Sequence, residues 1–332
     1  CYDGEEGFTQ SLCLTNTGVN TLKLNRLEHF IRNFKTEGKH MSGEQLHTFL
    51  DNIEKTHGLY SPPALGLAAA IACCGFTFLL GGGPIEMFCA FVGAGIGNYL
   101  RCKLTKYHFT LFLCIVSSVS LACFAYAGML KLGEILFGIS VQHEAGYICA
   151  MLFIIPGFPF ITSGIDLAKL DMRSGMERLM YALIVILVAT MSAWIMALIL
   201  HLKPVNFMKL SLTMSQWILF RILASFCGVF GFSIMFNSSV YIAATAACIG
   251  AVANTLRLEL VDYAGMPSAA AAFIGALTAG LLASIIKRNH GYPRISLTVP
   301  SIVIMVPGLY LYRAIYNFGI MSLTEAVLWL AA

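Results

Sequence analysis

The chain of 332 residues is 58% hydrophobic and only 11% charged, with a formal net charge of +4. Soluble domains usually carry about 25% charged residues, so the composition excludes an ordinary water-soluble enzyme or binding domain. No dense basic run with interleaved aromatic residues accompanies the small positive charge, which argues against nucleic-acid binding. The apolar runs are about 17–24 residues long and do not alternate, which predicts helices that span a bilayer, not barrel strands.

Residues 1–60 are the only part of the sequence that resembles a soluble protein. The stretch "FTQSLCLTNT" (8–17) alternates like a strand, and "LKLNRLEHFIRNF" predicts an amphipathic helix. Ser42 and Gln45 predict a capping box at the start of a second helix. We expect a small α+β piece, the C-terminal part of a cytoplasmic N-terminal domain, which Pro62-Pro63 separate from the membrane region.

Ten apolar segments follow, at about 64–80, 84–100, 107–129, 145–161, 179–202, 216–236, 238–256, 267–286, 295–312 and 319–332. The first two could instead form one re-entrant pair. Pro156-Gly157 in the fourth segment recurs as Pro307-Gly308 in the ninth, which predicts five-helix repeats over 64–202 and 216–332. Because five is odd, the second repeat must enter the membrane in the opposite sense. The expected fold is an all-α polytopic membrane protein of about ten transmembrane helices in two inverted repeats.

The basic residues predict the orientation of the chain. With the N-terminus inside, the inner loops hold Arg101, Lys103, Lys106, Lys169, Arg173, Arg178, Lys287, Arg288 and Arg294. The outer loops then hold only Lys131, Lys203, Lys209, Arg257 and Arg313. This bias follows the positive-inside rule and places both termini in the cytoplasm.

The helix breaks and nearby polar residues are the candidate site. Proline removes a backbone donor inside a helix, and the freed groups must face protein or a water-filled cavity. The candidate substrate-binding residues are Pro156, Gly157, Pro159, Thr162, Ser163, Asp166, Pro307, Gly308, Tyr312 and Arg313. The candidate proton-coupling residues are Asp166, Asp171 and Glu86.

Simpler roles remain open for these residues. The prolines could have no role beyond bending a helix, and Asp166 could be a solvated loop residue. Glu86 could have no role beyond stabilising the start of a helix through the helix dipole. The Arg313 side chain could extend to the membrane interface. His143 and Glu144 are expected to be solvated in an outer loop.

Catalytic and metal-binding motifs are missing from the sequence. There is no HExxH, no GxSxG and no recognisable pair of intramembrane aspartates, so we expect no catalytic residues and no enzyme. The eleven cysteines show no CxxC or Cys/His spacing. We therefore expect no metal site and no cofactor.

Four stretches resemble the ThrE-type threonine/serine exporter family: "GVNTLKLNRLEHFIRNF" (18–34), "GGGPIEMFCAFVGAGIG" (81–97), "PGFPFITSGIDLAKLDMRSGMERLMYAL" (156–183) and "YPRISLTVPSIVIMVPGLYLYRAIY" (292–316). The resemblance spans nearly the whole chain. It implies ten helices and export of small hydroxylated amino acids across the plasma membrane, driven by the proton-motive force. Related two-chain versions are associated with succinate export. The bulky residues at 158–160 and 309–311 depart from the family pattern and are expected to reshape the pocket.

The sequence is therefore read as a multi-pass secondary exporter of threonine, serine or a similar small polar amino acid. A dicarboxylate exporter and a passive small-solute channel remain the alternatives. The expected partners are the substrate, protons and the lipid bilayer, but no nucleic acid. A homo-oligomer is left open.

Overall fold

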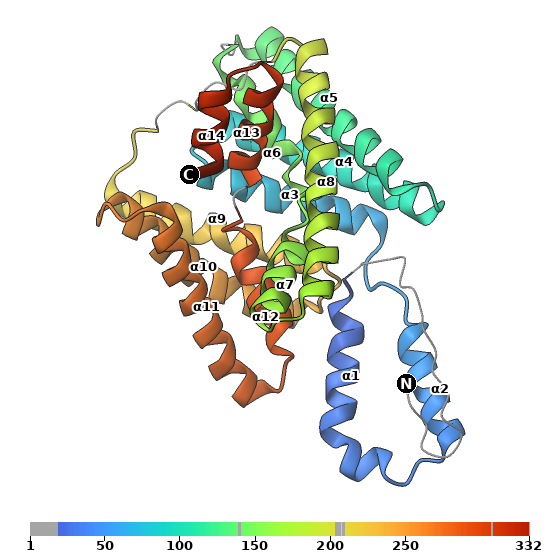
Figure 1. The fold of residues 1–332 in the computed structure, drawn as a ribbon. Coiled ribbons are helices and arrows are strands. Elements are labelled where there is room, and N and C mark those ends of the chain that lie inside the picture. Colours follow the sequence, from blue (N-terminus) through green and yellow to red (C-terminus); the bar gives the residue numbers. More distant parts are fainter. Residues whose placement is uncertain (1–18, 139–140, 203–206, 208–209, 307, 332) are drawn as a thin grey trace.

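The computed structural model describes residues 19–138, 141–202, 207, 210–306 and 308–331. Within these ranges every regular element is a helix or helical turn, and none is a strand (Figure 1). The strand expected over residues 8–17 lies outside the described residues. The described part of the N-terminal region is therefore helical, and an α+β piece is not confirmed.

Residues 19–60 form an arm that extends from the helical bundle (Figure 1). The arm contains α1 (Thr21–Asn33), a π-helical turn η1 (Phe34–Gly38) and α2 (Gly43–Glu54). The capping box predicted at Ser42 is confirmed, because the Gln45 amide donates to Ser42 Oγ and the Ser42 amide donates to Gln45 Oε1. The base of the arm is tied to the bundle by a hydrogen bond from the Thr21 amide to the Phe236 carbonyl (3.1 Å).

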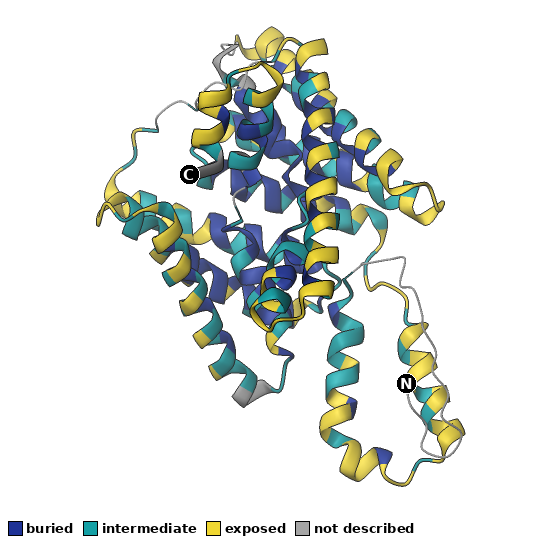
Figure 2. Ribbon diagram, viewed as in Figure 1, coloured by how far each residue is buried: buried dark blue, intermediate teal, exposed yellow. Residues whose placement is uncertain are grey.

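The bundle consists of two successive halves. The first contains α3 (Pro62–Leu79), α4 (Pro84–Lys106), α5 (Leu111–Phe137), η2 (Val141–Gly146), α6 (Tyr147–Ala150), η3 (Leu152–Ile154), α7 (Gly157–Ala168) and α8 (Met172–Ile199). The second contains α9 (Met214–Met235), α10 (Val240–Asp262), α11 (Ser268–His290), α12 (Arg294–Val303), α13 (Gly308–Gly319) and α14 (Leu323–Ala331). Buried residues gather where the halves meet, and exposed apolar residues cover the outer helix faces (Figure 2).

Six helices in the described ranges are long and apolar enough to cross a membrane: α3, α5, α8, α9, α10 and α11. A seventh span is a bent pair, Tyr147–Ile154 and Gly157–Ala168, which meet at 55°. The break predicted in the fourth segment is thus present, although the helix resumes and continues to Ala168, beyond the expected end at 161. The protein is a multi-pass membrane protein, and its described residues contain six or seven such candidate spans against the ten expected.

Small residues bring α3 and α9 into backbone contact. A β-carbon at Gly75 would overlap the Ala224 carbonyl, and one at Gly231 would overlap the Ala68 carbonyl. The two contacts are reciprocal, since Gly75 and Ala68 lie on α3 and their partners lie on α9. In lipid, where helix association depends on close packing, glycine and alanine make such contacts favourable. We call this contact the α3–α9 seam.

The second half repeats local backbone details of the first. The Gly157 amide donates to the Ile155 carbonyl (2.8 Å), and 151 residues later the Gly308 amide donates to the Val306 carbonyl (2.8 Å). The following helices, α7 and α13, are both 12 residues long. Each is followed by a non-glycine residue with positive φ, Leu170 (64°) and Met321 (62°). These features thus recur at the same interval of 151 residues.

Candidate functional site

The two helix breaks cross each other between the halves. A β-carbon at Gly157 would overlap the Val303 side chain, and one at Gly308 would overlap the Ile155 side chain. A larger residue at either position would therefore require a side chain of the other break to move. Pro307 itself lies outside the described residues.

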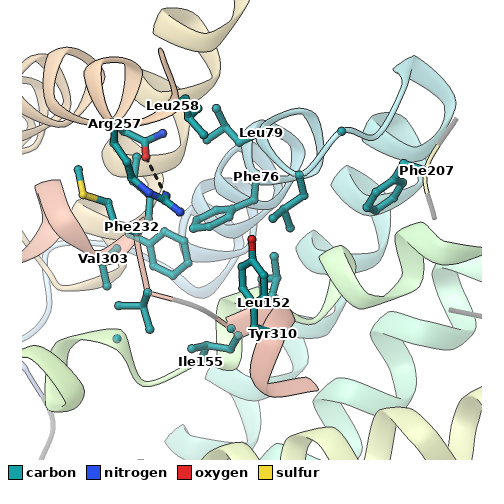
Figure 3. A pocket seen from close by; sticks show the side chains of 18 of the residues that line it. Phe76, Leu79, Leu152, Ile155, Phe207, Phe232, Arg257, Leu258, Val303 and Tyr310 are labelled. Carbon is teal, nitrogen blue, oxygen red and sulfur yellow. Dashed lines mark hydrogen bonds between the residues drawn. The ribbon is translucent and has the colours of Figure 1, made fainter. Parts of the chain in front are cut away.

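A cavity of about 610 Å³ lies beside this crossing (Figure 3). Its lining comes from the ends of α3, α9 and α10 and from the segments around both breaks. The residues that shape its apolar part include Phe76, Leu79, Leu152, Phe232, Val303 and Tyr310. The Phe76 and Phe232 rings pack edge to face, with centroids 5.5 Å apart. The size is that of a small-molecule site.

Arg257 carries a positive charge into this cavity from α10. Its Nη1 donates to Asn254 Oδ1 (3.3 Å), and Asn254 Nδ2 donates to Ser225 Oγ on α9 (2.9 Å). The dashed line in Figure 3 marks the first of these contacts. Within the described ranges, Arg257 forms no ion pair and its buried Nε has no hydrogen-bond partner. An arginine held in this way is available to an anion, because a buried guanidinium is costly without one.

Arg313 provides a second positive charge in the cavity from α13. Its guanidinium carbon lies 4.5 Å from the centre of the Trp329 ring on α14, a cation–π contact. Among the described lining residues, the charged side chains are these two arginines, and neither an aspartate nor a glutamate is present. The cavity is therefore electropositive.

The cavity brings together only some of the residues predicted from the sequence. Gly157, Gly308 and Arg313 line it. Thr162 and Ser163 are buried within α7 and donate to carbonyls of their own helix, those of Phe158 (3.0 Å) and Phe160 (2.8 Å). The remaining predicted residues also lie outside the lining: Pro156 and Pro159 flank Gly157, and the buried Tyr312 pairs its hydroxyl with that of Tyr147 (2.6 Å).

Asp166 and Asp171 also lie away from the cavity. Asp166 accepts a hydrogen bond from Arg178 Nη1 (2.7 Å), an ion pair that joins α7 to α8. Asp171 is the N-cap of α8, and its carboxylate accepts from the Ser174 amide (3.3 Å). Hydrogen bonds from Ser174 lower the pKa of Asp171 below its usual value.

Glu86 is the buried carboxylate of the candidate set, with 1% of its surface exposed. One oxygen accepts from the Gly83 amide (3.0 Å), and the other lies 2.7 Å from His143 Nδ1. His143 was expected to be solvated, but its side chain is only 13% exposed because the 141–146 segment folds back onto α4. The Tyr126 hydroxyl donates to the His143 carbonyl (2.6 Å) and holds this segment in place.

Sequence reasoning missed Arg257 and Asn254, because Arg257 was assigned to an outer loop after a helix ending at 256. In the structure α10 continues to Asp262. A signal was nevertheless present in the sequence: "NYLR" (98–101) recurs as "NTLR" (254–257). In both stretches the asparagine and the arginine are three residues apart near the end of an apolar helix.

The fold and the cavity define the class: a multi-pass helical membrane protein with a solute-sized, electropositive cavity between its two halves. Residues 1–200 match the ThrE family model of threonine/serine exporters, and residues 221–330 match a second model described as "Threonine/Serine exporter, ThrE". The chain belongs to the ThrE family. No curated protein and no solved structure matches it.

Proposed function

We propose that the protein is a secondary transporter that exports threonine, serine or a similar small polar amino acid across the plasma membrane, driven by the proton-motive force. The observation that carries the proposal is the cavity where the two breaks cross, lined by Arg257 and Arg313. Broken helices at the interface of two halves are where secondary transporters bind their substrates. The family to which the chain belongs supports the choice of threonine and serine.

We propose that residues 64–202 and 216–332 form an inverted repeat, preceded by a cytoplasmic region at 1–60. The reciprocal α3–α9 seam and the two matched breaks support it. In this arrangement α4 and the bent Tyr147–Ile154 and Gly157–Ala168 pair each count as one span. With both termini in the cytoplasm, α3 then runs outward and α10 also ends at the outer surface. The cavity, lined by Leu79 and Leu258 near those ends, then faces outward.

A bound amino acid would place its carboxylate between the two arginines. A planar guanidinium offers a carboxylate paired donors, and such charge-assisted bonds are stronger than neutral ones. The substrate side chain would contact Phe76 and Phe232. Because no carboxylate is among the described lining residues, the substrate ammonium must rely on carbonyls and π-faces.

For the coupled proton we propose Glu86, in contact with His143. Among the three candidate carboxylates, Asp166 and Asp171 are at the ends of helices and more accessible to water, whereas Glu86 is enclosed. The titratable groups within electrostatic reach of Glu86 are Cys89 on its own helix, Tyr126 on α5 and Cys149 on α6. Cysteine and tyrosine are ordinarily neutral at pH 7, so we assign the coupled proton to the contact between Glu86 and His143.

The test is efflux of labelled threonine, serine and succinate from proteoliposomes under an imposed pH gradient. Wild type should export threonine or serine, and Glu86→Gln should abolish the response to the gradient while allowing exchange of substrate across the membrane. Glu177→Gln is the matched control, because Glu177 is exposed and paired only with Arg173 four residues away. A gradient response that survives in Glu86→Gln would exclude Glu86 as the proton carrier.

A second candidate, dicarboxylate export, is favoured by one observation. Two guanidinium groups without a carboxylate among the described lining residues suit a substrate with two negative charges. Succinate flux without threonine or serine flux in the same experiment would establish this alternative. If the flux of every solute is independent of the pH gradient, the protein is instead a passive channel.

A further inference from the structure

The "NYLR" and "NTLR" stretches occupy equivalent places in the two halves. α4 begins at Pro84 and ends at Lys106, and α10 begins at Val240 and ends at Asp262, so both boundaries are 156 residues apart. Asn98 and Asn254 are separated by the same 156 residues, as are Arg101 and Arg257. The correspondence is therefore structural as well as sequential.

Each asparagine ties its helix to the preceding helix of its own half. Asn98 is 2% exposed and donates from Nδ2 to the Leu65 carbonyl on α3 (2.8 Å). Asn254 is 1% exposed and donates from Nδ2 to Ser225 Oγ on α9 (2.9 Å). A buried amide that is satisfied in this way is a rigid support for a neighbouring side chain.

The side chains of Arg101 and Arg257 have different surroundings. Arg257 lines the cavity, as does Ile304 at the second break. Arg101 instead directs Nη1 at the Phe153 carbonyl (3.5 Å), just before the first break. Phe153 precedes Ile304, which lines the cavity as Arg257 does, by 151 residues, the interval that separates the two breaks. Arg101 itself is not among the described residues that line the cavity.

We infer that Asn98 and Arg101 form a second carboxylate-binding site, near the cytoplasmic end of the molecule, which opens when the two halves exchange conformations. The inference rests on the proposed function and on the inverted repeat. In the conformation described here, Arg257 lines the cavity, whereas Arg101 lies outside its lining and donates to a backbone carbonyl. In the opposite conformation Arg101 would bind the carboxylate of a substrate arriving from the cytoplasm.

The second site would bind more weakly than the first. The residue equivalent to Arg313, 151 positions earlier, is Thr162, which is uncharged. The cytoplasmic site therefore has one guanidinium and a hydroxyl, where the outer cavity has two guanidinium groups. This arrangement gives Thr162, now bonded within α7, a role in the opposite conformation.

The test compares substrate entry from each face, with inside-out vesicles for the cytoplasmic face and right-side-out vesicles for the outer face. Losing a charge-assisted contact should raise the cytoplasmic-face KM of Arg101→Gln by about tenfold or more and change its outer-face KM less than about twofold. Arg257→Gln should show the reverse pattern. Lys106→Gln, which removes an exposed cation from the same end of α4, is the matched control and should change neither KM.

Arg101→Lys is the control for a folding defect, because it keeps the positive charge. It should remain monodisperse and give a cytoplasmic-face KM between those of wild type and Arg101→Gln. Equal KM changes on both faces, or an effect no larger than that of Lys106→Gln, would overturn the second site while leaving the transporter intact. A wild type that moves threonine, serine and succinate from neither face would mean that the proposed function is wrong, and the inference would fall with it.

Discussion

The break before Gly157 and the break before Gly308 have the same backbone hydrogen bond, from the glycine amide to the carbonyl two residues earlier. Each glycine packs on a side chain of the other break. The helices that follow differ, because α7 carries Thr162 where α13 carries Arg313. The backbone feature common to both halves thus sets where the helices break. The side chains that differ between the halves set the charge next to each break. Four predictions test this division.

The largest effect is expected at the residues that differ between the breaks. Arg313→Gln removes one of two charges from the cavity, and a hydrogen bond to a charged group contributes about 1.5–3 kcal/mol, or roughly ten- to hundredfold in affinity. Thr162→Ala should change the outer-face affinity less than about threefold, because its hydroxyl bonds within α7. Substrate binding to the purified protein measures both. Similar losses in the two variants would show that the breaks are not chemically distinct.

The second prediction concerns the reciprocal glycine contacts of the α3–α9 seam. Gly75→Ala and Gly231→Ala each drive a β-carbon into a backbone carbonyl across the α3–α9 seam, and overpacking of this kind costs about 1–3 kcal/mol. Because the contacts are reciprocal, the two variants should lower the thermal unfolding midpoint by similar amounts. Gly128→Ala is the control, since nothing lies near its added methyl group. A large difference between Gly75→Ala and Gly231→Ala would count against the correspondence of the halves.

The third prediction is that Asp166 is not required for gradient-driven transport. The equivalent residue in the second half is Asn317, so the turn after the broken helix does not need a carboxylate. Asp166→Asn should lower the free energy of unfolding by only about 0–1 kcal/mol, because the Arg178 partner is half exposed. Gradient-driven flux should stay close to that of wild type. Loss of coupling in this variant would restore Asp166 as the proton carrier.

The smallest effect is expected at the start of the helix after each break. Asp171 caps α8 and Ser322 occupies the equivalent position. Since hydrogen bonds lower the pKa of Asp171, its cap stabilises the fold above the ordinary aspartate pKa and is lost as the pH falls through the lowered value. Asp171→Asn should keep the cap and remove this acid sensitivity. Unfolding midpoints between pH 7 and pH 3 would show it, and identical pH profiles for the two proteins would argue against it.

Local sequence signals predicted the helical class, the broken fourth segment and the capping box at Ser42. These features depend on composition, on proline and glycine, and on residues three apart, all of which are visible in a single chain. Gly157, Gly308 and Arg313 were found for the same reason. The two glycines follow prolines that break an apolar segment, and an arginine is rare in such a segment.

The features that were missed depend on tertiary contacts. Arg257 looked like a loop residue, since only the packing of α10 against α9 and the cavity shows why a helix can hold that charge. His143 looked solvated, since the return of the 141–146 segment to Glu86 is set by distant residues such as Tyr126. The ion pair of Asp166 with Arg178 was not predicted, since Arg178 lies on the next helix.

The α3–α9 seam also bears on the ancestry of the chain. Its two glycine contacts are interchangeable, so one half offers the other the same surface that it receives. Two copies of a single ancestral half could have met through that surface, provided that the copies were inserted in opposite directions. On this view the protein is a dimer whose subunits became joined end to end. Under the inverted repeat that we propose, Arg313 and Thr162 mark one position at which the two halves differ in charge.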